Sequence, residues 1–349
     1  MPSTSSTPGV SPQAHDLVIG SFLHQGTKAT QEDGVAVDPN FNAFMEKVAA
    51  ANGLDCIDID MSPRRTFVCL LDGHAGPTCK EYVQQRILTQ ICLEFIRAPG
   101  SWPDAMRKAI MEMERKWCRR VCEHDPADRS GTTITIAILE SNQLHCAWTG
   151  DSPCWLLDRA GTATAMTTQH RPSLAREQER IEKSGGEIKA KVVEGTGFWR
   201  RGGQRKEGPL RVFPSGLNIS RSIGDIKYKV PKLGGQEGVV IADPDTRSID
   251  LPSDVEYIVI SSDGLSDNLT KGLGESYKPI CKGFRNAYDA LKEGREDPEP
   301  GQEPMEFCAD LAAESLVYFA IKRGKSQKYQ DNTSMVAICL LDNMKIAPL

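Results

Sequence analysis

Residues 132–138 read Thr-Thr-Ile-Thr-Ile-Ala-Ile, with isoleucine at every second position from 134 to 138. This period of two, with its β-branched side chains, predicts a half-buried β-strand. Two more strand-like runs, 144–149 and 154–158, follow closely along the chain. Strands that follow one another without an intervening helix lack the alternation of a doubly wound parallel sheet, so they favour antiparallel pairing.

Similar patterns recur along the rest of the sequence. Strands are predicted over residues 16–22, 34–38, 66–71, 132–139, 144–149, 154–158, 239–242, 256–261 and 334–341. Helices are predicted over residues 78–96, 102–122, 174–184 and 305–322. Ser101 and Asp104 make a capping box for the second helix, and Gly185-Gly186 ends the third. Because the helices fall between groups of strands, we expect an α+β fold of antiparallel sheets covered by helices.

The composition limits the classes of function. The 349 residues are 39% hydrophobic and 26% charged, and 42 Lys and Arg against 47 Asp and Glu give a net charge of −5. We therefore expect no general attraction to nucleic acid or to an anionic membrane. No apolar run approaches the ~20 residues of a membrane span, and we expect no secretory signal or myristoylation at the N-terminus. The 11 Cys, without a Cys-x-x-Cys pair, indicate a reducing compartment.

Three segments lack a regular pattern. Residues 1–14 contain no charged side chain, and we expect them to be disordered. Residues 187–211 are rich in glycine and basic side chains, and residues 271–304 end in an acidic, proline-containing run. Long loops of this kind are usually functional or disordered.

The chemical signal is a repeated pattern in which an apolar strand ends in aspartate beside glycine. It occurs at Asp72 in Phe67-Val-Cys-Leu-Leu-Asp72-Gly73-His74, at Asp151 after Gly150, and at Asp263 before Gly264. Carboxylates also occur at Glu32-Asp33 and at Asp331, before the last strand. An all-oxygen set of this kind selects a hard cation, namely Mg2+, Mn2+ or Ca2+.

A single Asp-Gly pair is also an ordinary turn signal. Five carboxylate sites, three of which close strong strands, are harder to explain as turns, and bringing them together requires a compensating cation. The sequence contains no phosphate-binding P-loop, nucleophile elbow or Cys-x5-Arg motif. A hydrolase with two hard metal ions and a metal-stabilised binding domain both remain open.

At this point the chain resembles the metal-dependent protein serine/threonine phosphatases of type 2C, the PPM family. The resemblance rests on eight motifs in family order: 32–33 (Glu-Asp), 72–76 (Asp-Gly-His-Ala-Gly), 130–133 (Ser-Gly-Thr-Thr), 150–152 (Gly-Asp-Ser), 180–186 (Arg-Ile-Glu-Lys-Ser-Gly-Gly), 220–225 (Ser-Arg-Ser-Ile-Gly-Asp), 262–267 (Ser-Asp-Gly-Leu-Ser-Asp) and 331–332 (Asp-Asn). It implies a central β-sandwich of two antiparallel sheets flanked by helices on both sides, formed as one catalytic domain over residues 15–349.

The resemblance also implies roles for individual residues. Two Mg2+ or Mn2+ ions and a third, weaker site would be held by Glu32, Asp33, Asp72, the Gly73 carbonyl, Asp151, Asp263 and Asp331. A hydroxide bridging two metals would attack the phosphorus of phosphoserine or phosphothreonine in a protein substrate. His74 would protonate the leaving oxygen as a general acid, with a purely structural histidine as the alternative. Ser220, Arg221 and Asp225 would support the site without a direct role.

Four positions depart from the family pattern. They are Lys28 in place of a phosphate-binding arginine, Ala75 in place of glycine, Pro153 in place of arginine and Ser266 in place of a bulky residue. Lys28 offers phosphate a point charge instead of a planar fork, or is merely a solvated charge. A catalytically inactive scaffold and a hydrolase of small phosphoesters are the alternatives to a protein phosphatase. We expect a monomeric, cytoplasmic signalling enzyme and leave the nucleus open; residues 187–211 would form a flap and 271–304 an insertion.

Overall fold

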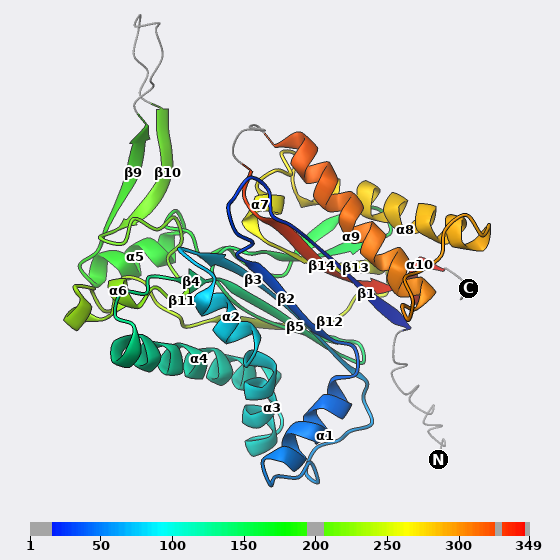
Figure 1. Cartoon of the computed structure of the whole chain (residues 1–349), viewed down its shortest axis with the longest axis horizontal. Helices are drawn as coiled ribbons and strands as arrows, with labels where there is room; N and C mark the ends of the chain where they lie inside the picture. The colour runs from blue at the N-terminus through cyan, green and yellow to red at the C-terminus, as the bar shows by residue number, and fades with distance from the viewer. Residues whose placement is uncertain (1–15, 194–205, 325–329, 346–349) are drawn as a thin grey trace, which may run out of the picture.

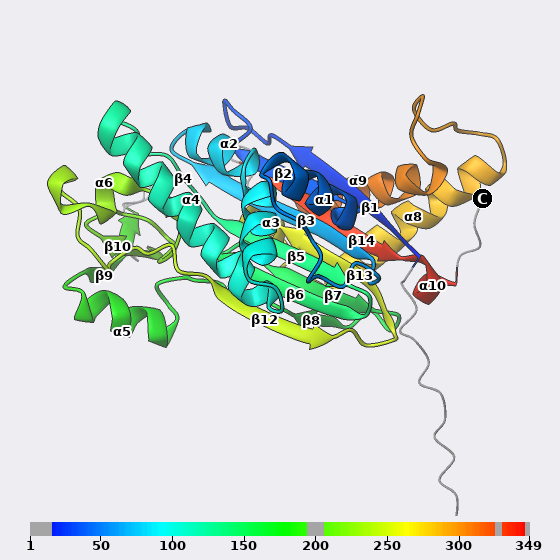
Figure 2. The same ribbon diagram turned by 90° about the horizontal axis from the view of Figure 1, so that it is seen from below.

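The computed structural model describes residues 16–193, 206–324 and 330–345. Two antiparallel sheets pack face to face, and helices cover the outer face of each sheet (Figures 1 and 2). The predicted α+β class is therefore confirmed. The predicted disordered segment 1–14 and the middle of the predicted basic loop, residues 194–205, lie outside the described residues. Among the helices of the described ranges, none combines the length and the apolar character needed to cross a membrane.

The larger sheet has the strand order β11-β4-β3-β5-β6-β12, and β2 also pairs with β3. Its strands are β2 (Asp33–Asp38), β3 (Arg65–His74), β4 (Gly131–Thr132), β5 (Ile134–Glu140), β6 (Gln143–Thr149), β11 (Ile223–Gly224) and β12 (Asp245–Asp250). The smaller sheet has the order β1-β14-β13-β7-β8. Its strands are β1 (Leu17–His24), β7 (Cys154–Asp158), β8 (Ala163–Ala165), β13 (Val255–Ser261) and β14 (Thr333–Leu340).

Helices on the two outer faces complete the layers. The larger sheet is covered by α1 (Phe41–Ala51), α2 (Thr78–Gln84), α3 (Ile87–Arg97) and α4 (Trp102–His124). The smaller sheet is covered by α8 (Tyr277–Lys292) and α9 (Pro304–Arg323). The short helices are α5 (Ala175–Lys183), α6 (Ile226–Lys229), α7 (Asp263–Ser266), α10 (Leu341–Met344) and the 3-10 turns Pro231–Leu233 and Leu273–Ser276.

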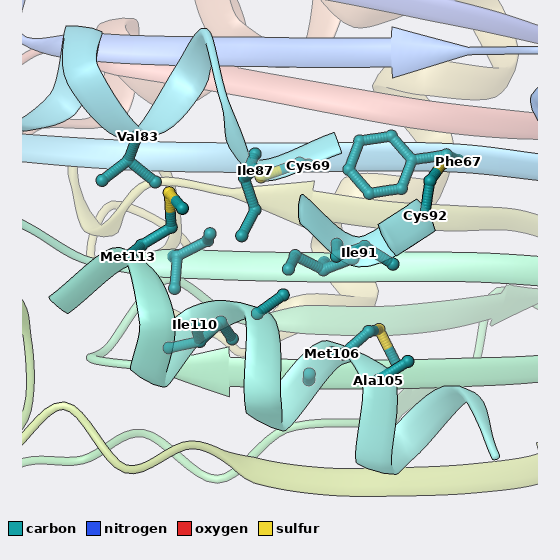
Figure 3. Close-up of a cluster of buried hydrophobic side chains, with 14 of the residues drawn as sticks. Phe67, Cys69, Val83, Ile87, Ile91, Cys92, Ala105, Met106, Ile110 and Met113 are labelled. Carbon is teal, nitrogen blue, oxygen red and sulfur yellow. The ribbon is translucent and has the colours of Figure 1, made fainter. Parts of the chain in front are cut away.

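Alternation along the strands divides the apolar side chains among three cores. On β3, Phe67, Cys69 and Leu71 face the helices in the cluster drawn in Figure 3, whereas Val68 and Leu70 lie between the sheets. Strands β13 and β14 divide their residues in the same way between the central core and the α8–α9 layer. A strand buried on both faces has no polar side in its sequence, so Phe67-Val-Cys-Leu-Leu reads as a continuous apolar run.

Two predicted elements are wrong. Residues 239–242 do not form a strand, because Arg180 donates hydrogen bonds to the carbonyls of Gly238 and Val239, and Val239 and Val240 are buried in a small cluster with Ile181. The predicted helix 78–96 is two helices, α2 and α3, which break at Gln85 and Arg86. Neither proline nor glycine marks that break.

Two segments without a regular sequence pattern are in fact ordered in large part. Residues 271–304 contain α8, whose buried side chains recur at helical spacing at Ile280, Phe284 and Ala287. The described ends of segment 187–211 form an antiparallel hairpin of β9 (Glu187–Val193) and β10 (Lys206–Phe213). In Figure 1 this hairpin projects away from the sandwich.

Gly20 allows β1 to lie against α9, and this contact offers a test of the layer packing. A Cβ atom at this position would collide with the backbone carbonyl of Ala309. We expect Gly20→Ala to lower the free energy of unfolding by about 1–3 kcal/mol, because backbone cannot move aside as a side chain can. Urea denaturation measures the change. Ser21→Ala on the same strand is the control, and an equal loss in both variants would contradict this account.

Candidate metal centre

The end of β3 brings the first two predicted carboxylates together. Asp33, the first residue of β2, pairs in register with Asp72 near the end of β3. Gly73 then donates its N–H to the carbonyl of Glu32 at 3.1 Å. A Cβ on Gly73 would lie 2.6 Å from that carbonyl oxygen, so only glycine permits this approach. The Asp72-Gly73 sequence thus fixes the 32–33 segment beside the strand end.

A second close approach joins the smaller sheet to the same region. Asp263 begins α7 directly after β13, and a Cβ on Gly264 would collide with the carbonyl of Asn332. Asn332 in turn accepts a hydrogen bond at Oδ1 from the N–H of Glu32 at 2.9 Å. One asparagine therefore connects the loop before β14 to the acidic segment at the start of β2.

Lys28 supplies a positive charge to this group of acids. Its ammonium forms an ion pair with Asp331 and lies 3.5 Å from Oε2 of Glu32. Oε1 of Glu32 accepts a hydrogen bond from the N–H of Gly76 at 2.8 Å. Although burial opposes it, the hydrogen bond and charge of Asp331 raise the pKa of Lys28 to about 12. Lys28 is therefore charged at neutral pH and is held by predicted metal ligands.

Arg171 supplies a positive charge to Asp151, which follows β6. Its Nε lies 3.1 Å from Oδ2 of Asp151, and its Nη2 lies 2.9 Å from Oδ1 of Asp267. The preceding residue, His170, accepts a hydrogen bond at Nδ1 from the N–H of Gly150 at 3.1 Å. Arg171 thus provides a positive charge next to Asp151, where the sequence has Pro153 instead of the arginine usual in the family.

Asp33 and Asp151 are buried, Asp72 and Asp263 are half-buried, and the acids act on one another through their charges. Burial and the charge of Asp33 raise the pKa of Asp72 well above its usual value, with a further contribution from Asp263. Burial and the charges of Asp151 and Asp267 do the same for Asp263. Burial raises the pKa of both Asp33 and Asp151 to about 6. Lys28 lowers the pKa of Asp33 and Arg171 lowers that of Asp151, but neither charge offsets the desolvation of its partner. The region therefore favours an added cation.

The donor atoms fit a hard divalent metal ion. Both carboxylate oxygens of Asp33 and Oδ2 of Asp151 are buried without a hydrogen bond of normal geometry. Together with Asp72 and Asp263 they offer only oxygen ligands, which suit Mg2+ or Mn2+. Across the described ranges, no three Asp, Glu, His or Cys side chains are close enough to form a finished ligand cluster. The ligand roles of the individual residues therefore stay predictions.

His74 lies beside a carboxylate that the sequence did not assign to it. Its Nε2 is 2.8 Å from Oδ2 of Asp225, to which Ser222 Oγ also donates a hydrogen bond at 2.6 Å. A Cβ on Gly131 would lie 2.6 Å from His74 Nε2, so this glycine makes room for the pair. Burial alone would lower the pKa of His74, but the charge of Asp225 and its hydrogen bond outweigh burial and raise it.

Sequence reasoning therefore missed two partners in this region. Asp225 stood within a quoted motif, but nothing in the spacing shows that residue 225 meets residue 74. Arg171 is one of many arginines, and only the fold brings it to Asp151 and Asp267. The backbone conformation of Ala75, with φ 57°, was also missed. This φ lies in the left-handed region of backbone conformation, which glycine adopts without strain, and this explains why glycine is usual at position 75 in the family.

Comparisons with known proteins agree with these features. A family model described as "Protein phosphatase 2C" matches residues 21–325. "Probable protein phosphatase 2C 60" of Arabidopsis thaliana is 24% identical over 71% of this chain and 75% of its own length. "Protein phosphatase 1L" of Bos taurus is 31% identical over 57% of this chain and 50% of its own length. Several other relatives are matched over only 43–59% of their length.

Solved structures share the fold. The serine-threonine phosphatase 2C from Toxoplasma gondii superposes with a TM-score of 0.61 at 17% identity, covering 94% of this chain and 96% of that chain. A sex-determining protein of C. elegans superposes with a TM-score of 0.63 at 23% identity, covering 95% of this chain and 67% of that chain. Both confirm the layered architecture expected from the sequence.

The pairing of His74 with Asp225 predicts a change in titration. Asp225→Asn should lower the pKa of His74, because the amide keeps the shape but removes the charge that outweighs burial. In the unmodified chain, the stabilisation from this pair is fully present below the ordinary histidine pKa of 6.5 and is lost as pH rises through the higher folded pKa. NMR titration of the His74 ring measures its pKa in the unmodified chain and in the variant. Asp243→Asn, whose carboxylate pairs with Arg107, is the control; equal pKa values in all three proteins would contradict the assignment.

The ion pairs of Lys28 predict a competition for its carboxylate partners. Lys28→Gln should tighten Mn2+ binding by about tenfold, because Asp331 and Glu32 would no longer be paired with an ammonium group. Calorimetric titration of the EDTA-treated protein measures the dissociation constant. Lys28→Arg keeps the charge and should bind Mn2+ as the unmodified chain does. Weaker binding by Lys28→Gln would show that Lys28 does not compete with the metal.

Proposed function

The chain belongs to the protein phosphatase 2C family, and we propose that it is a metal-dependent phosphatase that removes phosphate from phosphoserine and phosphothreonine in proteins. The observation that carries this proposal is the set of buried and half-buried carboxylates at the ends of β3, β6 and β13. Desolvation raises the pKa of Asp72, Asp151 and Asp263, and the charge of Asp151 adds to the shift of the other two. Acids in this arrangement are costly to a fold unless they serve a cation.

We assign the metal ligands from the family pattern and the chemistry of the site. Asp72 would bridge two ions, Asp263 and Asp331 would complete one of them, and the Gly73 carbonyl would serve the other. Glu32 and Asp33 would hold water molecules on the ions, and Asp151 would share a third site with Asp263. When bound, Mg2+ or Mn2+ ions supply a water of lowered pKa as the nucleophile and neutralise charge on the phosphoryl oxygens.

His74 is the proposed general acid. Asp225 holds Nε2 and favours the protonated imidazole, which leaves Nδ1–H to donate a proton to the serine or threonine oxygen as the bond to phosphorus breaks. At 25% side-chain exposure, His74 is accessible to a substrate while Asp225 is fully buried. A raised pKa keeps a larger fraction of His74 protonated near neutral pH, as an acid catalyst requires.

Lys28 is the proposed phosphate-binding residue. Its side chain is 32% exposed and stays charged, and it already lies among the acids assigned to the metals. An ammonium group pairs with a phosphoryl oxygen through its charge, without the two-pronged geometry of arginine. We therefore expect Lys28 to bind phosphate less specifically than an arginine would at this position.

The same ion pair supports one alternative. Because Lys28 is bonded to Asp331, one assigned ligand is already partly neutralised. A chain in which this pair persists would keep the fold as a binding module and lose activity. Turnover therefore decides between the two functions.

Phosphate release from a phosphothreonine peptide tests the proposal. We expect release that requires Mn2+ or Mg2+, is abolished by EDTA and falls more than about a hundredfold in Asp263→Asn, because the amide removes a ligand charge. Asp254→Asn, on the exposed turn between β12 and β13, is the matched control and should keep full activity.

Two results would contradict it. Absence of turnover in a chain that binds Mn2+ would favour the binding module. Release from sugar phosphates at a higher kcat/KM than from the phosphopeptide would instead indicate a hydrolase of small phosphoesters.

A further inference from the structure

A groove runs between α8 and α9 on the outer face of the smaller sheet. It consists of two hollows of about 530 Å³ and 430 Å³, which share Pro279 and Phe319 in their walls. The two helices lie side by side in Figures 1 and 2. None of the residues assigned to the metal centre lines either hollow.

Small residues form the floor of the groove. A Cβ on Gly283 of α8 would lie 2.5 Å from Oγ of Ser315 on α9, so the two helices approach closely at this point. Larger side chains rise beside this contact, including Tyr318, which is 39% exposed, and Phe319. A shallow floor between aromatic walls is a shape that accepts an apolar side chain from a partner.

The rim of the groove is basic. Lys271, Lys278, Lys282 and Lys322 line it and are exposed, and within the described part of the chain none of these lysines has an ion-pair or hydrogen-bond partner. Arg323 also lines the groove, where it pairs with Glu275 and lies over the ring of Phe319.

The charges leave the groove positive. Two acids line the groove, Glu275 and Glu314, and Glu275 is paired with Arg323. The four lysines without a partner therefore outnumber Glu314, the acid that could neutralise them. In a chain with a net charge of −5, such a local excess of positive charge calls for a negatively charged partner.

We propose that this groove binds an acidic segment of the phosphoprotein substrate, one that carries a large apolar side chain and lies outside the phosphorylated residue. Carboxylates of that segment would pair with the lysines, and its apolar side chain would pack on Phe319 and Pro279. The proposal rests on the proposed function, because it assigns substrate selection to a surface separate from the metal centre.

The position of the groove suits this role. Lys271 and Gly274 follow shortly after α7, the helix that begins with Asp263, and α7 packs against α9. The groove therefore begins beside an element of the metal centre. The chain's own acidic run, residues 293–304, joins the opposite ends of α8 and α9. No residue of that run lines either hollow, so the run does not cover the groove.

Binding of an unphosphorylated peptide tests the groove without turnover. The probe is a fluorescein-labelled peptide of alternating Glu and Gly around one Phe, added to the full EDTA-treated chain and followed by fluorescence anisotropy. We expect saturable binding that weakens about tenfold in the double variant Lys278→Glu/Lys282→Glu. The double variant Lys47→Glu/Lys108→Glu changes the net charge equally on exposed residues of α1 and α4, and should bind as the unmodified chain does.

Kinetics give a second readout. For a phosphothreonine peptide extended by the acidic segment, the groove variant should raise KM about tenfold and leave kcat unchanged. A phosphopeptide without the extension should be cleaved equally by all three proteins.

Three results of the binding assay would overturn the proposal: no binding of the acidic peptide, equal weakening in both double variants, or equal binding of a peptide with Gln in place of Glu. A mass that rises with concentration and falls in the groove variant would also overturn it, since the groove would then bind a second copy of the chain. Because the anisotropy assay needs no turnover, its failure is distinct from an absence of phosphatase activity.

Discussion

Desolvation and mutual repulsion of carboxylates at the ends of strands from two different sheets are the constraint on which this structure depends. Asp72 lies near the end of β3 of the larger sheet and Asp263 follows β13 of the smaller one. Burial raises the pKa of both carboxyl groups, and the charge of Asp263 adds to the shift of Asp72. Packing the sheets face to face brings these strand ends to one edge of the sandwich. Glycine at 73 and 264 then lets backbone from the 32–33 and 331–332 segments approach closely. A fold that concentrates acids in this way requires cations to stabilise it.

Two basic side chains of the chain itself partly neutralise these carboxylates. Lys28 pairs with Asp331 and Glu32, and Arg171 pairs with Asp151 and Asp267. Both lie close to residues assigned to metals, so cation binding and side-chain pairing compete for the same carboxylates. Asp225 is different, because its own partner is His74 and its pKa is lowered. The carboxylates of the site therefore have two roles. Most are assigned to metal ions, whereas Asp225 serves the proposed proton donor His74.

Local patterns were sufficient to predict the sheets and the acids but not the contacts between distant segments. Alternation over 132–138 and the capping Ser101 predict β5 and α4 well, because side-chain period and capping are local properties. The missed helix α8 lies in a charged, polar segment whose burial depends on α9. Residues 239–242 have strand-like composition, but Arg180 donates hydrogen bonds to the carbonyls of Gly238 and Val239 at the start of this segment. The pairing of His74 with Asp225 spans 151 residues and leaves no local signal.

Anomalous diffraction from crystals grown with Mn2+ can show whether these carboxylates hold metal ions. Carboxylates from both sheets are expected to hold manganese, so we expect anomalous peaks within coordination distance of Asp72, with one of them shared with Asp263. The same map from Asp263→Asn crystals should lose that shared peak. Manganese bound only at surface acids, with no anomalous density beside Asp72 at millimolar Mn2+, would contradict the account.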